Sequence, residues 1–392
     1  MKILLLHQKL GFQGGAEQYI YNTAPSIRKY HQLEFAYIEN TDVGSEQFIE
    51  AFDGVHCLAT YHWSIQKLVD SVKPDLIYIH NIANIVCLEE LQSISIPKVR
   101  MIHDHESYCM RGYRYFPWNR KVCTKKAGFP CLFPCMAPIK RDRTARPFGF
   151  RWESWRDKMH EISLNQKLDA FFVGSEFMKK ELILQDFNSE KIQIIPPVPL
   201  PAQGTIQSSF SPENIILFIG QVIRGKGLDC LIEALNKVQT PWRLCVIGQG
   251  THLDFCKQRA LALGLNERID FVGYLPQTEI LDYMSEATML AVPSVWPEPF
   301  GAVGLEAMRQ GLPVIAFDSG GIRDWLIHEK TGYLVPNQDI TTFAQRIESL
   351  LLNKDQAKLM GEAGKNRADK EFSFEEHMDS LVTKLESISK QI

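Results

Sequence analysis

The chain has 392 residues, 45% hydrophobic and 23% charged, which is the composition of an ordinary globular protein. This chain is longer than most domains that are built around one hydrophobic core, so two or three domains are expected. The formal net charge of −3 argues against a protein that binds nucleic acid through its overall charge. No apolar run reaches the ~18 residues of a membrane span. Nine cysteines without an export signal indicate a reducing, cytoplasmic compartment.

Strand-like and helix-like segments alternate along the first half of the chain, the pattern of a parallel sheet covered on both faces. Strands are predicted at 2–7, 33–38, 76–80, 98–103 and 170–173, and helices after the first strand, over 156–165 and after Glu176. Gly14 and Gly15 occupy the first strand-to-helix turn, where open α/β sheets bind ligands. A tight turn that needs glycine is the alternative reading. His103 ends the strand 98–103 at the same edge of the sheet.

Residues 111–158 interrupt this alternation with a basic, aromatic insertion. They hold 13 Lys and Arg against 3 Asp and Glu, a balance of +10, interleaved with Tyr, Phe and Trp. Such a mixture fits an anionic membrane face, nucleic acid or the groove of an anionic acceptor. Nucleic acid is the poorest fit, because the whole chain is slightly acidic and shows no nucleic-acid module. A solvated insertion whose aromatic residues form a small local core is the plain alternative.

Four of the nine cysteines fall within 27 residues of this region: Cys109, Cys123, Cys131 and Cys135. Thiolates at such spacings can close a tetrahedral zinc site, and a loop with few aliphatic residues needs a staple of this kind. An iron–sulfur cluster, redox-active thiols and plain free thiols stay open as alternatives. The other five cysteines are scattered and are expected to be small buried hydrophobic residues.

A proline-rich linker at 196–211 precedes a second series of strands. These strands are predicted at Ile215–Ile219, Arg243–Ile247, 269–272, Met289–Val292, Val314–Phe317 and 331–335. The loop after the first of them carries Arg224 and Lys226, two cations suited to a diphosphate, although a solvated turn would look the same. The turns at Gly248 and at Tyr274 and Leu275 lie at the right edge to wrap a nucleobase. A charged, amphipathic tail begins near Ser373.

The most informative segment is 294–313, S-V-W-P-E-P-F-G-A-V-G-L-E-A-M-R-Q-G-L-P. Two prolines keep Glu298 out of regular helix, and a helix is expected from Ala302. Gly301 and Gly304 in its first turn cost helix stability, which suggests that a phosphate closely approaches the free N–H groups there. Glu298 and Glu306 would then accept hydrogen bonds from adjacent hydroxyls of a sugar or ribose. An ordinary αβ unit with solvated glutamates is the alternative.

Glu298 and Glu306, with seven residues between them in E-P-F-G-A-V-G-L-E-A-M-R-Q-G-L-P-V-I-A, resemble the signature of family 4 retaining glycosyltransferases. The resemblance implies the α/β GT-B fold, in which two Rossmann-like domains face each other across a cleft. It divides the chain into an acceptor domain (1–200) with a cysteine-rich insertion (about 109–158), a nucleotide-sugar domain (201–372), and a helix (373–392) that crosses back to the first domain.

The resemblance also implies an activity and the residues that carry it. A sugar would move, with retention at its anomeric carbon, from a UDP- or GDP-sugar to a glycan or lipid-linked acceptor in cell-surface polysaccharide or glycoconjugate biosynthesis. His103 would touch the sugar, Glu298 a sugar hydroxyl and Glu306 the ribose. The donor phosphates would meet Gly14, Gly15, Arg224, Lys226 and the N–H groups near Phe300 and Gly301. Gln221 departs from the family pattern, since the family has an arginine there.

No Asp-x-Asp occurs in the chain, so no divalent metal is expected in catalysis, and zinc in the insertion would be structural. The enzyme is expected in the cytoplasm or at the inner face of the membrane, held there by residues 111–158. Two other functions stay open: a GT-B nucleotide-sugar epimerase or hydrolase, and a non-catalytic glycan- or lipid-binding protein with a relict site.

Overall fold

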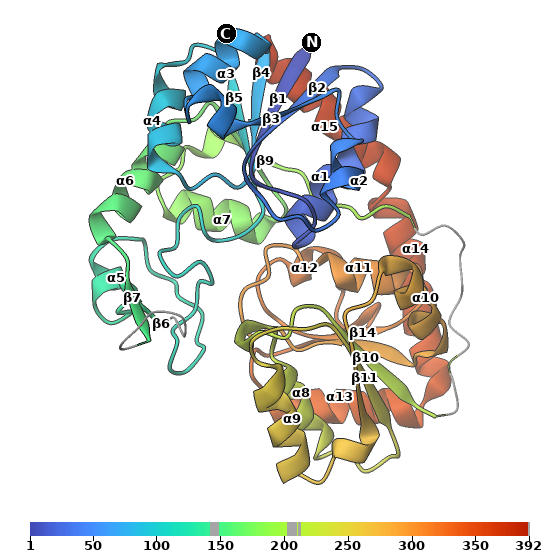
Figure 1. Ribbon diagram of the computed structural model, residues 1–392. Helices are drawn as coiled ribbons and strands as arrows, with labels where there is room; N and C mark the ends of the chain where they lie inside the picture. Colours follow the sequence, from blue (N-terminus) through green and yellow to red (C-terminus); the bar gives the residue numbers. More distant parts are fainter. Residues whose placement is uncertain (142–148, 202–209, 211–212, 391–392) are drawn as a thin grey trace. The chain divides into compact units, whose positions relative to one another are not determined.

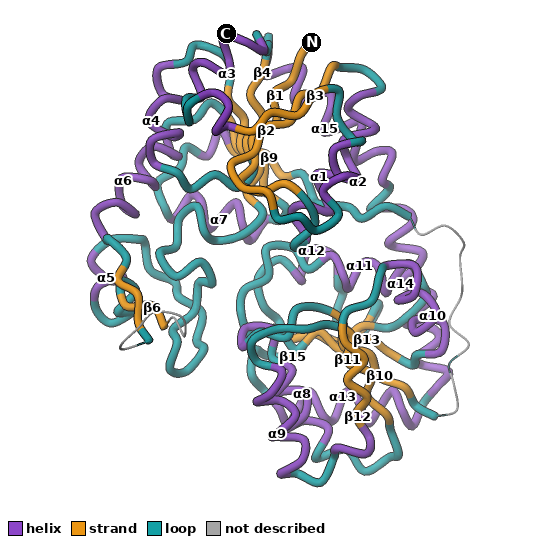
Figure 2. Tube along the Cα trace, viewed as in Figure 1, coloured by secondary structure: helices purple, strands orange, loops and turns teal. Residues whose placement is uncertain are grey.

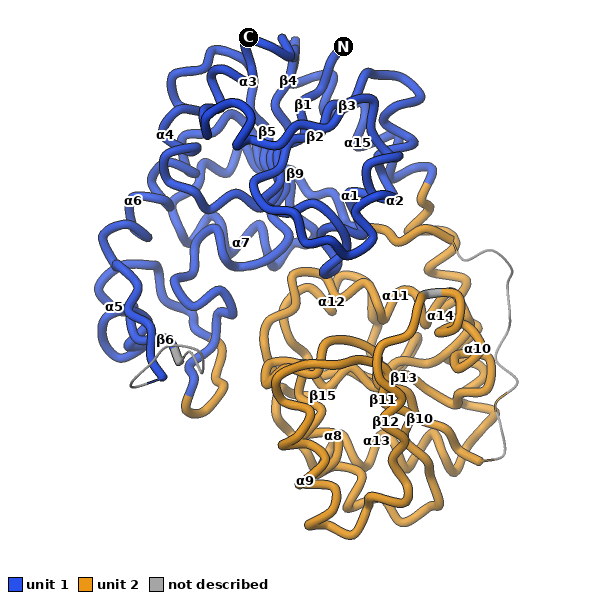
Figure 3. The backbone as a smooth tube through the Cα atoms, in the orientation of Figure 1, with its two compact units in different colours: residues 1–117, 123–197, 375–392 blue, residues 118–122, 198–374 orange. Residues whose placement is uncertain are grey.

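The computed structural model describes residues 1–141, 149–201, 210 and 213–390, and these form two α/β units. Unit 1 holds residues 1–117, 123–197 and 375–392, and unit 2 holds residues 118–122 and 198–374 (Figure 3). Most of the predicted linker, at 202–209 and 211–212, lies outside the described residues, as do residues 142–148 of the insertion.

Unit 1 is built on a seven-stranded sheet of order β3-β2-β1-β4-β5-β8-β9, in which every neighbouring pair is parallel. The strands are β1 (Lys2–Leu10), β2 (Gln32–Asn40), β3 (Gly54–Cys57), β4 (Leu76–Ile79), β5 (Lys98–Ile102), β8 (Ala170–Val173) and β9 (Ile192–Ile194). All residues of β4, β5 and β8 are buried, as expected for central strands covered on both faces. The five predicted strands are confirmed. The two edge strands, β3 and β9, are additional.

Helices lie on both sides of this sheet (Figure 2). They are α1 (Gly15–Arg28), α2 (Ser45–Ile49), α3 (Ile65–Val72), α4 (Ile85–Ser93), α6 (Trp155–Gln166), α7 (Glu176–Leu184) and α15 (Phe374–Ser389), with 3-10 turns at Leu58–Tyr61 and Ser189–Lys191. Side chains of Ser64, Asn84, Ser154 and Ser175 accept hydrogen bonds from backbone N–H groups and so cap α3, α4, α6 and α7. These caps explain why the helices begin at those residues.

The C-terminal helix α15 packs on unit 1 (Figure 1). The Tyr19 hydroxyl lies 3.2 Å from His377 Nε2, and Lys384 Nζ donates to the carbonyl of Ile194 at 3.2 Å. His31 Nε2 lies 3.0 Å from a Glu386 carboxylate oxygen. The prediction that the tail returns to the N-terminal part of the chain is therefore confirmed.

Unit 2 has a six-stranded parallel sheet of order β12-β11-β10-β13-β14-β15. The strands are β10 (Ile215–Ile219), β11 (Arg243–Ile247), β12 (Ile269–Gly273), β13 (Met289–Val292), β14 (Val314–Phe317) and β15 (Gly332–Val335). Strand order reverses between β10 and β13, as it does between β1 and β4 in unit 1. In sheets of this kind ligands bind outside the carboxyl ends of the strands at that point.

The core of unit 2 follows the alternation of side chains along its strands. Ile216 and Phe218 of β10 and Ile315 of β14 belong to one buried cluster with α8, α9 and α13. The helices of the unit are α8 (Leu228–Leu235), α9 (Leu253–Ala262), α10 (Gln277–Glu286), α11 (Ala302–Arg309), α12 (Ile322–Trp325), α13 (Ile340–Leu352) and α14 (Lys354–Glu371), with 3-10 turns at Arg224–Lys226 and Asn266–Arg268.

The insertion contains little regular structure: α5 (Phe129–Leu132) and the antiparallel pair β6 (Ile139–Arg141) and β7 (Phe150–Trp152). Its short segment Trp118–Val122 belongs to unit 2. There the Arg120 guanidinium pairs with both carboxylate oxygens of Asp229, one of them at 3.0 Å. Within the described part of the chain, no helix has the length and apolar character needed to cross a membrane.

Candidate functional site

The centre of the site in unit 2 is an ion pair at the point where strand order reverses. Lys226 follows β10 and Glu298 follows β13, and Lys226 Nζ lies 2.7 and 3.0 Å from the two carboxylate oxygens of Glu298. Backbone hydrogen bonds hold the two loops together, because the N–H groups of Val295 and Trp296 donate to the carbonyl of Gly225 at 2.9 and 3.1 Å. The sheet topology therefore brings together two residues that are 72 positions apart.

Glu298 is only 4% exposed, so its charge needs partners. Burial alone would raise the pKa of its carboxyl, but Lys226 and the Ser294 hydroxyl outweigh burial and hold that pKa below its ordinary value. Lys226 Nζ also lies 4.9 Å from the centre of the Trp296 ring, a cation–π contact. At neutral pH the site therefore presents an oriented ammonium group backed by a buried carboxylate.

The backbone at Glu298 is held by the loop after β14. Gly321 N–H donates to the Glu298 carbonyl at 2.7 Å, and residues 298 and 320 form a parallel bridge. A Cβ on Gly320 would lie 2.2 Å from that carbonyl oxygen, and φ there is +69°. Gly320 is therefore required by close backbone packing, and that packing orients Glu298.

The two glycines at the start of α11 have different roles. Gly301 is the N-cap with φ +85°, a conformation that favours glycine. At Gly304 a Cβ would lie 2.0 Å from the Trp325 ring, whose Nε1 donates to the Phe300 carbonyl at 2.6 Å. The interpretation that Gly304 leaves room for a phosphate is therefore wrong. Its missing side chain makes room for Trp325.

Glu306 lies one turn into α11 and differs in environment from Glu298. It is half-buried, and no hydrogen-bond donor among the described residues is paired with its carboxylate. Burial raises the pKa of Glu306 to about 7, and the Arg309 guanidinium offsets only part of that rise. A poorly solvated carboxylate without a donor is suited to accept hydrogen bonds from a ligand.

The other predicted residues of unit 2 fall into two groups. Gly248 is required by packing, since a Cβ would lie 1.9 Å from the Gly220 carbonyl oxygen, and the Phe300 side chain is buried in the core. Tyr274 is 74% exposed, and Leu275 beside it is half-buried. Arg224 is half-buried in the 3-10 turn with Lys226, and the neighbouring Gln221 is exposed.

In unit 1 the predicted His103 lies directly after β5, and His80 lies directly after β4. Their rings stack with His80 Nδ1 2.6 Å from His103 Nε2. Burial lowers the pKa of His103 to about 3, and His7 adds to this effect. His103 is therefore a neutral hydrogen-bonding group at physiological pH, and one of its nitrogens is held by His80.

The glycines of the first turn lie at the same edge of the unit 1 sheet. Gly14 and Gly15 are exposed at the start of α1, and a Cβ on Gly15 would meet no atom within 4 Å. Neither packing nor backbone conformation requires glycine at Gly15, which favours ligand approach over the tight-turn alternative. Next to them, His7 Nε2 lies 3.0 Å from the Glu17 carboxylate in a buried pair.

Sequence reasoning did not identify three residues of the candidate site, Ser294, Trp296 and His80, or the pairing of Arg120 with Asp229. Ser294 and Trp296 flank Glu298 in the chain, and His80 ends a predicted strand, so position alone could have suggested these three. Arg120 carried no signal beyond the basic character of the insertion. The four predicted cysteines line one cavity in unit 1.

Each unit thus carries polar groups at the carboxyl edge of its sheet. In unit 2 a lysine, a buried carboxylate and a second carboxylate with a raised pKa surround the N-terminus of α11. A cation and a helix N-terminus can stabilise phosphate oxygens, and carboxylates can bind paired hydroxyls. These groups are those that a nucleoside diphosphate linked to a sugar requires.

The comparisons with known proteins agree with this chemistry. Residues 205–367 match the family model described as Glycosyl transferases group 1. The uncharacterized glycosyltransferase YqgM of Bacillus subtilis is 30% identical over 217 residues, which cover 54% of this chain and 59% of YqgM. A GDP-mannose-dependent alpha-(1-6)-phosphatidylinositol monomannoside mannosyltransferase of Mycobacterium tuberculosis is 28% identical over 179 residues, 43% of this chain and 46% of that protein. The chain spans about half the length of the curated relatives it matches.

Among solved structures, Anabaena Alr3699/HepE in complex with UDP-glucose superposes with a TM-score of 0.76 at 20% identity. The alignment covers 99% of this chain and 100% of that one. At this identity the likeness establishes the fold, which is GT-B with two parallel Rossmann-like sheets. Lys226, Glu298 and Glu306 all lie within the matched residues 205–367. Residues 205–367, which contain these three side chains, therefore match the glycosyl transferases group 1 family.

Proposed function

We propose that the protein is a retaining glycosyltransferase that moves a hexose from a nucleotide sugar to a hydroxyl of a glycan or lipid-linked acceptor. The observation that carries the proposal is the Lys226–Glu298 pair beside the N-terminus of α11, inside the residues that match the family. The mannosyltransferase of M. tuberculosis is described as GDP-mannose-dependent, and HepE is in complex with UDP-glucose. Donors of both kinds are therefore candidates here.

In the proposed reaction the bond between the anomeric carbon and the diphosphate oxygen breaks, and the acceptor oxygen bonds to the same face of that carbon. Charge builds up on the leaving diphosphate, and Lys226 with the free N–H groups at the start of α11 stabilises it. The acceptor proton moves to a leaving phosphate oxygen. Glu298 orients Lys226 through both of its carboxylate oxygens and accepts a hydrogen bond from a sugar hydroxyl in this proposal.

Glu306 accepts hydrogen bonds from the two ribose hydroxyls in this proposal, and neutral His103, held by His80, hydrogen-bonds to the transferred sugar. Arg224 adds positive charge where the family arginine is replaced by Gln221. Gly14 and Gly15 face the donor phosphates, and Tyr274 and Leu275 lie against the nucleobase. The product would be part of a cell-surface polysaccharide or glycoconjugate.

A panel of UDP- and GDP-sugars tests the donor by thermal shift. One member is expected to raise the melting temperature of the wild type by several degrees at a concentration of 100 Kd, a stabilisation of about 2.7 kcal/mol. Glu306→Gln should lose this shift, and Glu362→Gln, an exposed glutamate on α14, should keep it. Because burial raises the pKa of Glu306 to about 7, the wild-type affinity should fall from pH 8 to pH 6, and that of Glu362→Gln should fall in the same way.

Two outcomes contradict the transferase. The first is a folded protein that no nucleotide sugar stabilises at millimolar concentration. The second is conversion of the bound donor to free sugar or to an epimer, with equal rates in the presence and absence of acceptor glycans. That result would identify a hydrolase or epimerase that shares the nucleotide site.

We also propose that the acceptor is presented at an anionic membrane surface, which the insertion contacts. Its exposed aromatic residues support this, because Phe129, Phe133 and Trp152 are 71%, 70% and 73% exposed. Large apolar side chains among Lys and Arg are typical of interfacial segments. Each basic residue near an anionic surface contributes about 1 kcal/mol.

Vesicle co-sedimentation checks this surface. Wild-type protein should bind vesicles that contain phosphatidylglycerol, bind pure phosphatidylcholine much less, and dissociate at high salt. The double variant Phe133→Ser/Trp152→Ser should lose binding, and Phe255→Ser, an exposed aromatic residue of unit 2, should retain it. If the wild-type protein does not bind anionic vesicles at low salt, the membrane proposal fails, and a soluble glycan becomes the expected acceptor.

A further inference from the structure

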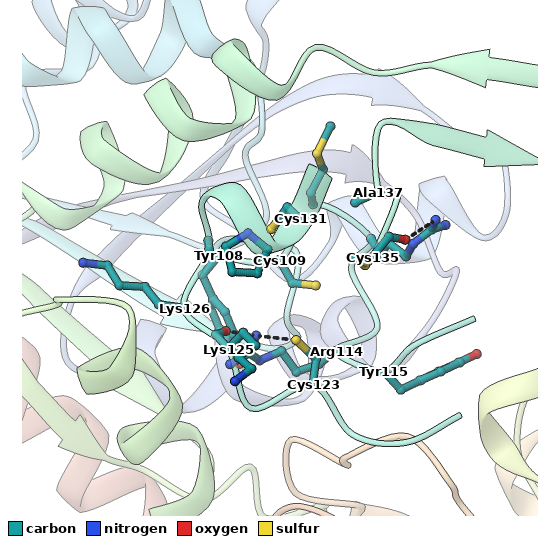
Figure 4. A pocket seen from close by; sticks show the side chains of 14 residues that line it. Tyr108, Cys109, Arg114, Tyr115, Cys123, Lys125, Lys126, Cys131, Cys135 and Ala137 are labelled. Atoms are coloured by element: carbon teal, nitrogen blue, oxygen red, sulfur yellow. Dashed lines mark hydrogen bonds between the residues drawn. The ribbon is translucent and has the colours of Figure 1, made fainter. Parts of the chain in front are cut away.

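The insertion encloses a cavity of about 20 Å³ that the donor-site proposal does not use. Four cysteines line it: one on the helix α5 and three on the loops around it (Figure 4). We call them the cysteine cluster: Cys109, Cys123, Cys131 and Cys135. None of the four is in a disulfide.

The surrounding chain has few other means of holding its shape. The local hydrophobic core has three buried residues, Met110, Cys135 and Ala137, with Phe116, Cys131 and Trp155 packed against it. Many of the large aromatic side chains of the insertion face solvent instead of this core. A lobe with so little buried apolar surface needs a cross-link or a metal to be stable.

The charges around the cavity favour an anionic centre. Arg111, Arg114, Lys125 and Lys126 are among the lining residues, and none of the described lining residues is a carboxylate. Arg114 Nη1 donates to Cys123 Sγ at 3.5 Å. Arg111 Nε and Arg114 Nη2 are buried with no acceptor among the described residues. Arg114 Nε pairs with Glu181 and Lys126 pairs with Asp186, so the charges of these two cations are already matched. The N–H groups of Arg111 Nε and Arg114 Nη2 are left over, and thiolate sulfurs would accept hydrogen bonds from them.

We propose that the cysteine cluster binds one structural Zn²⁺ ion. Four thiols lose their protons to water and four Zn–S bonds form, which leaves a centre of charge −2. Arg111 and the free N–H of Arg114 would donate hydrogen bonds to its sulfur atoms. Tetrahedral sulfur sites take zinc or an iron–sulfur cluster. The cavity has the size of a single water molecule or ion, which favours one metal ion over an iron–sulfur cluster.

Across the described ranges of the chain, no three His, Cys, Asp or Glu side chains already have the arrangement of a metal site. Binding therefore requires the cysteine side chains to turn toward the cavity that they share. The ion would then link three parts of the insertion: the loop at Cys109, the loop at Cys123 and the short helix α5. It would hold the exposed aromatic residues of α5 and β7 in place.

The first measurement is the metal content of the full chain, purified under reducing conditions without chelator. About one zinc ion per chain is expected in the wild type. The double variant Cys123→Ser/Cys131→Ser should lose most of it, and Cys57→Ser should retain it. Cys57 is half-buried, as Cys109, Cys123 and Cys131 are, but does not line the cavity.

A second measurement remains informative if the double variant does not fold. Wild-type protein is stripped of metal under reducing conditions and titrated with Co²⁺. Intense thiolate-to-cobalt absorption that saturates at about one ion per chain is expected, together with protection of residues 105–141 from protease. The proposal fails if neither Zn²⁺ nor Co²⁺ binds, if iron and acid-labile sulfide are found instead, or if the four thiols form disulfides in the reduced cytoplasmic protein.

Discussion

Lys226→Met is expected to lower the free energy of unfolding by about 3 kcal/mol at pH 7.5, because it leaves the Glu298 carboxylate buried without its counter-ion. The Ser294 hydroxyl alone cannot replace the charge of the ammonium group. Under the proposed function, turnover should also fall by at least about a hundredfold, because Lys226 stabilises the leaving diphosphate. Chemical denaturation and initial rates measure the two effects separately.

The pH dependence of this variant has a definite sign. In the wild type the pKa of Glu298 is depressed, so its contribution to stability is present above the unfolded value of about 4.5 and is lost as the pH falls through the folded value. In Lys226→Met burial raises the pKa of Glu298, so the variant loses stability as the pH rises above about 4.5. The difference between the two proteins should therefore shrink from pH 7.5 to pH 4.

Two further variants separate structure from catalysis. The double variant Lys226→Met/Glu298→Gln removes both charges and should regain most of the stability without regaining turnover. Arg243→Met breaks a pair with Asp270 in which both side chains are 48% exposed, and it should leave the stability nearly unchanged. Equal stability of wild type and Lys226→Met at pH 7.5 would show that the ion pair does not support the fold.

Gly361→Ala is expected to be strongly damaging although it adds a single methyl group in unit 2. A Cβ at Gly361 on α14 would lie 1.8 Å from the carbonyl oxygen of Gly311, directly after α11. Backbone atoms cannot move aside as a flexible side chain can. We therefore expect the free energy of unfolding to fall by about 3 kcal/mol, even though alanine has the higher helix propensity. Calorimetry should show a melting temperature lower by roughly 5–10 °C.

Gly364→Ala is the matched control, one turn further along the same helix. Its Cβ would lie 3.3 Å from Cγ of Met308, a side chain that can move by a few tenths of an ångström. Its stability should change by less than about 1 kcal/mol in either direction. If Gly361→Ala and Gly364→Ala have the same melting temperature, α14 does not pack on α11 as closely as described.

The buried strands could be read from the sequence, because their causes are local. Strands such as Ile215–Ile219 and Met289–Val292 are continuous apolar runs, and Gly311 marks the end of α11. The edge strands β3 and β9 were not predicted. Each has only three or four residues, and their pairing with β2 and β8 defines them more than their composition does.

The sequence also indicated the residue types at the candidate site, since Glu298, Glu306 and Lys226 lie in short, distinctive segments. It could not show that Lys226 and Glu298 form one ion pair, because 72 residues separate them and only the order of β10 and β13 brings them together. The stacking of His80 on His103 depends in the same way on the pairing of β4 with β5.

Tertiary packing also decided the meaning of residues that local reasoning misread. Gly304 seemed suited to a phosphate because glycine is costly in a helix, yet its neighbour in space is Trp325, 21 positions away in the sequence. The cysteine spacings suggested a shared site, but only the fold places all four around one cavity that Arg111 and Arg114 also line. Local sequence determines which elements form, and contacts between distant elements determine what each side chain can do.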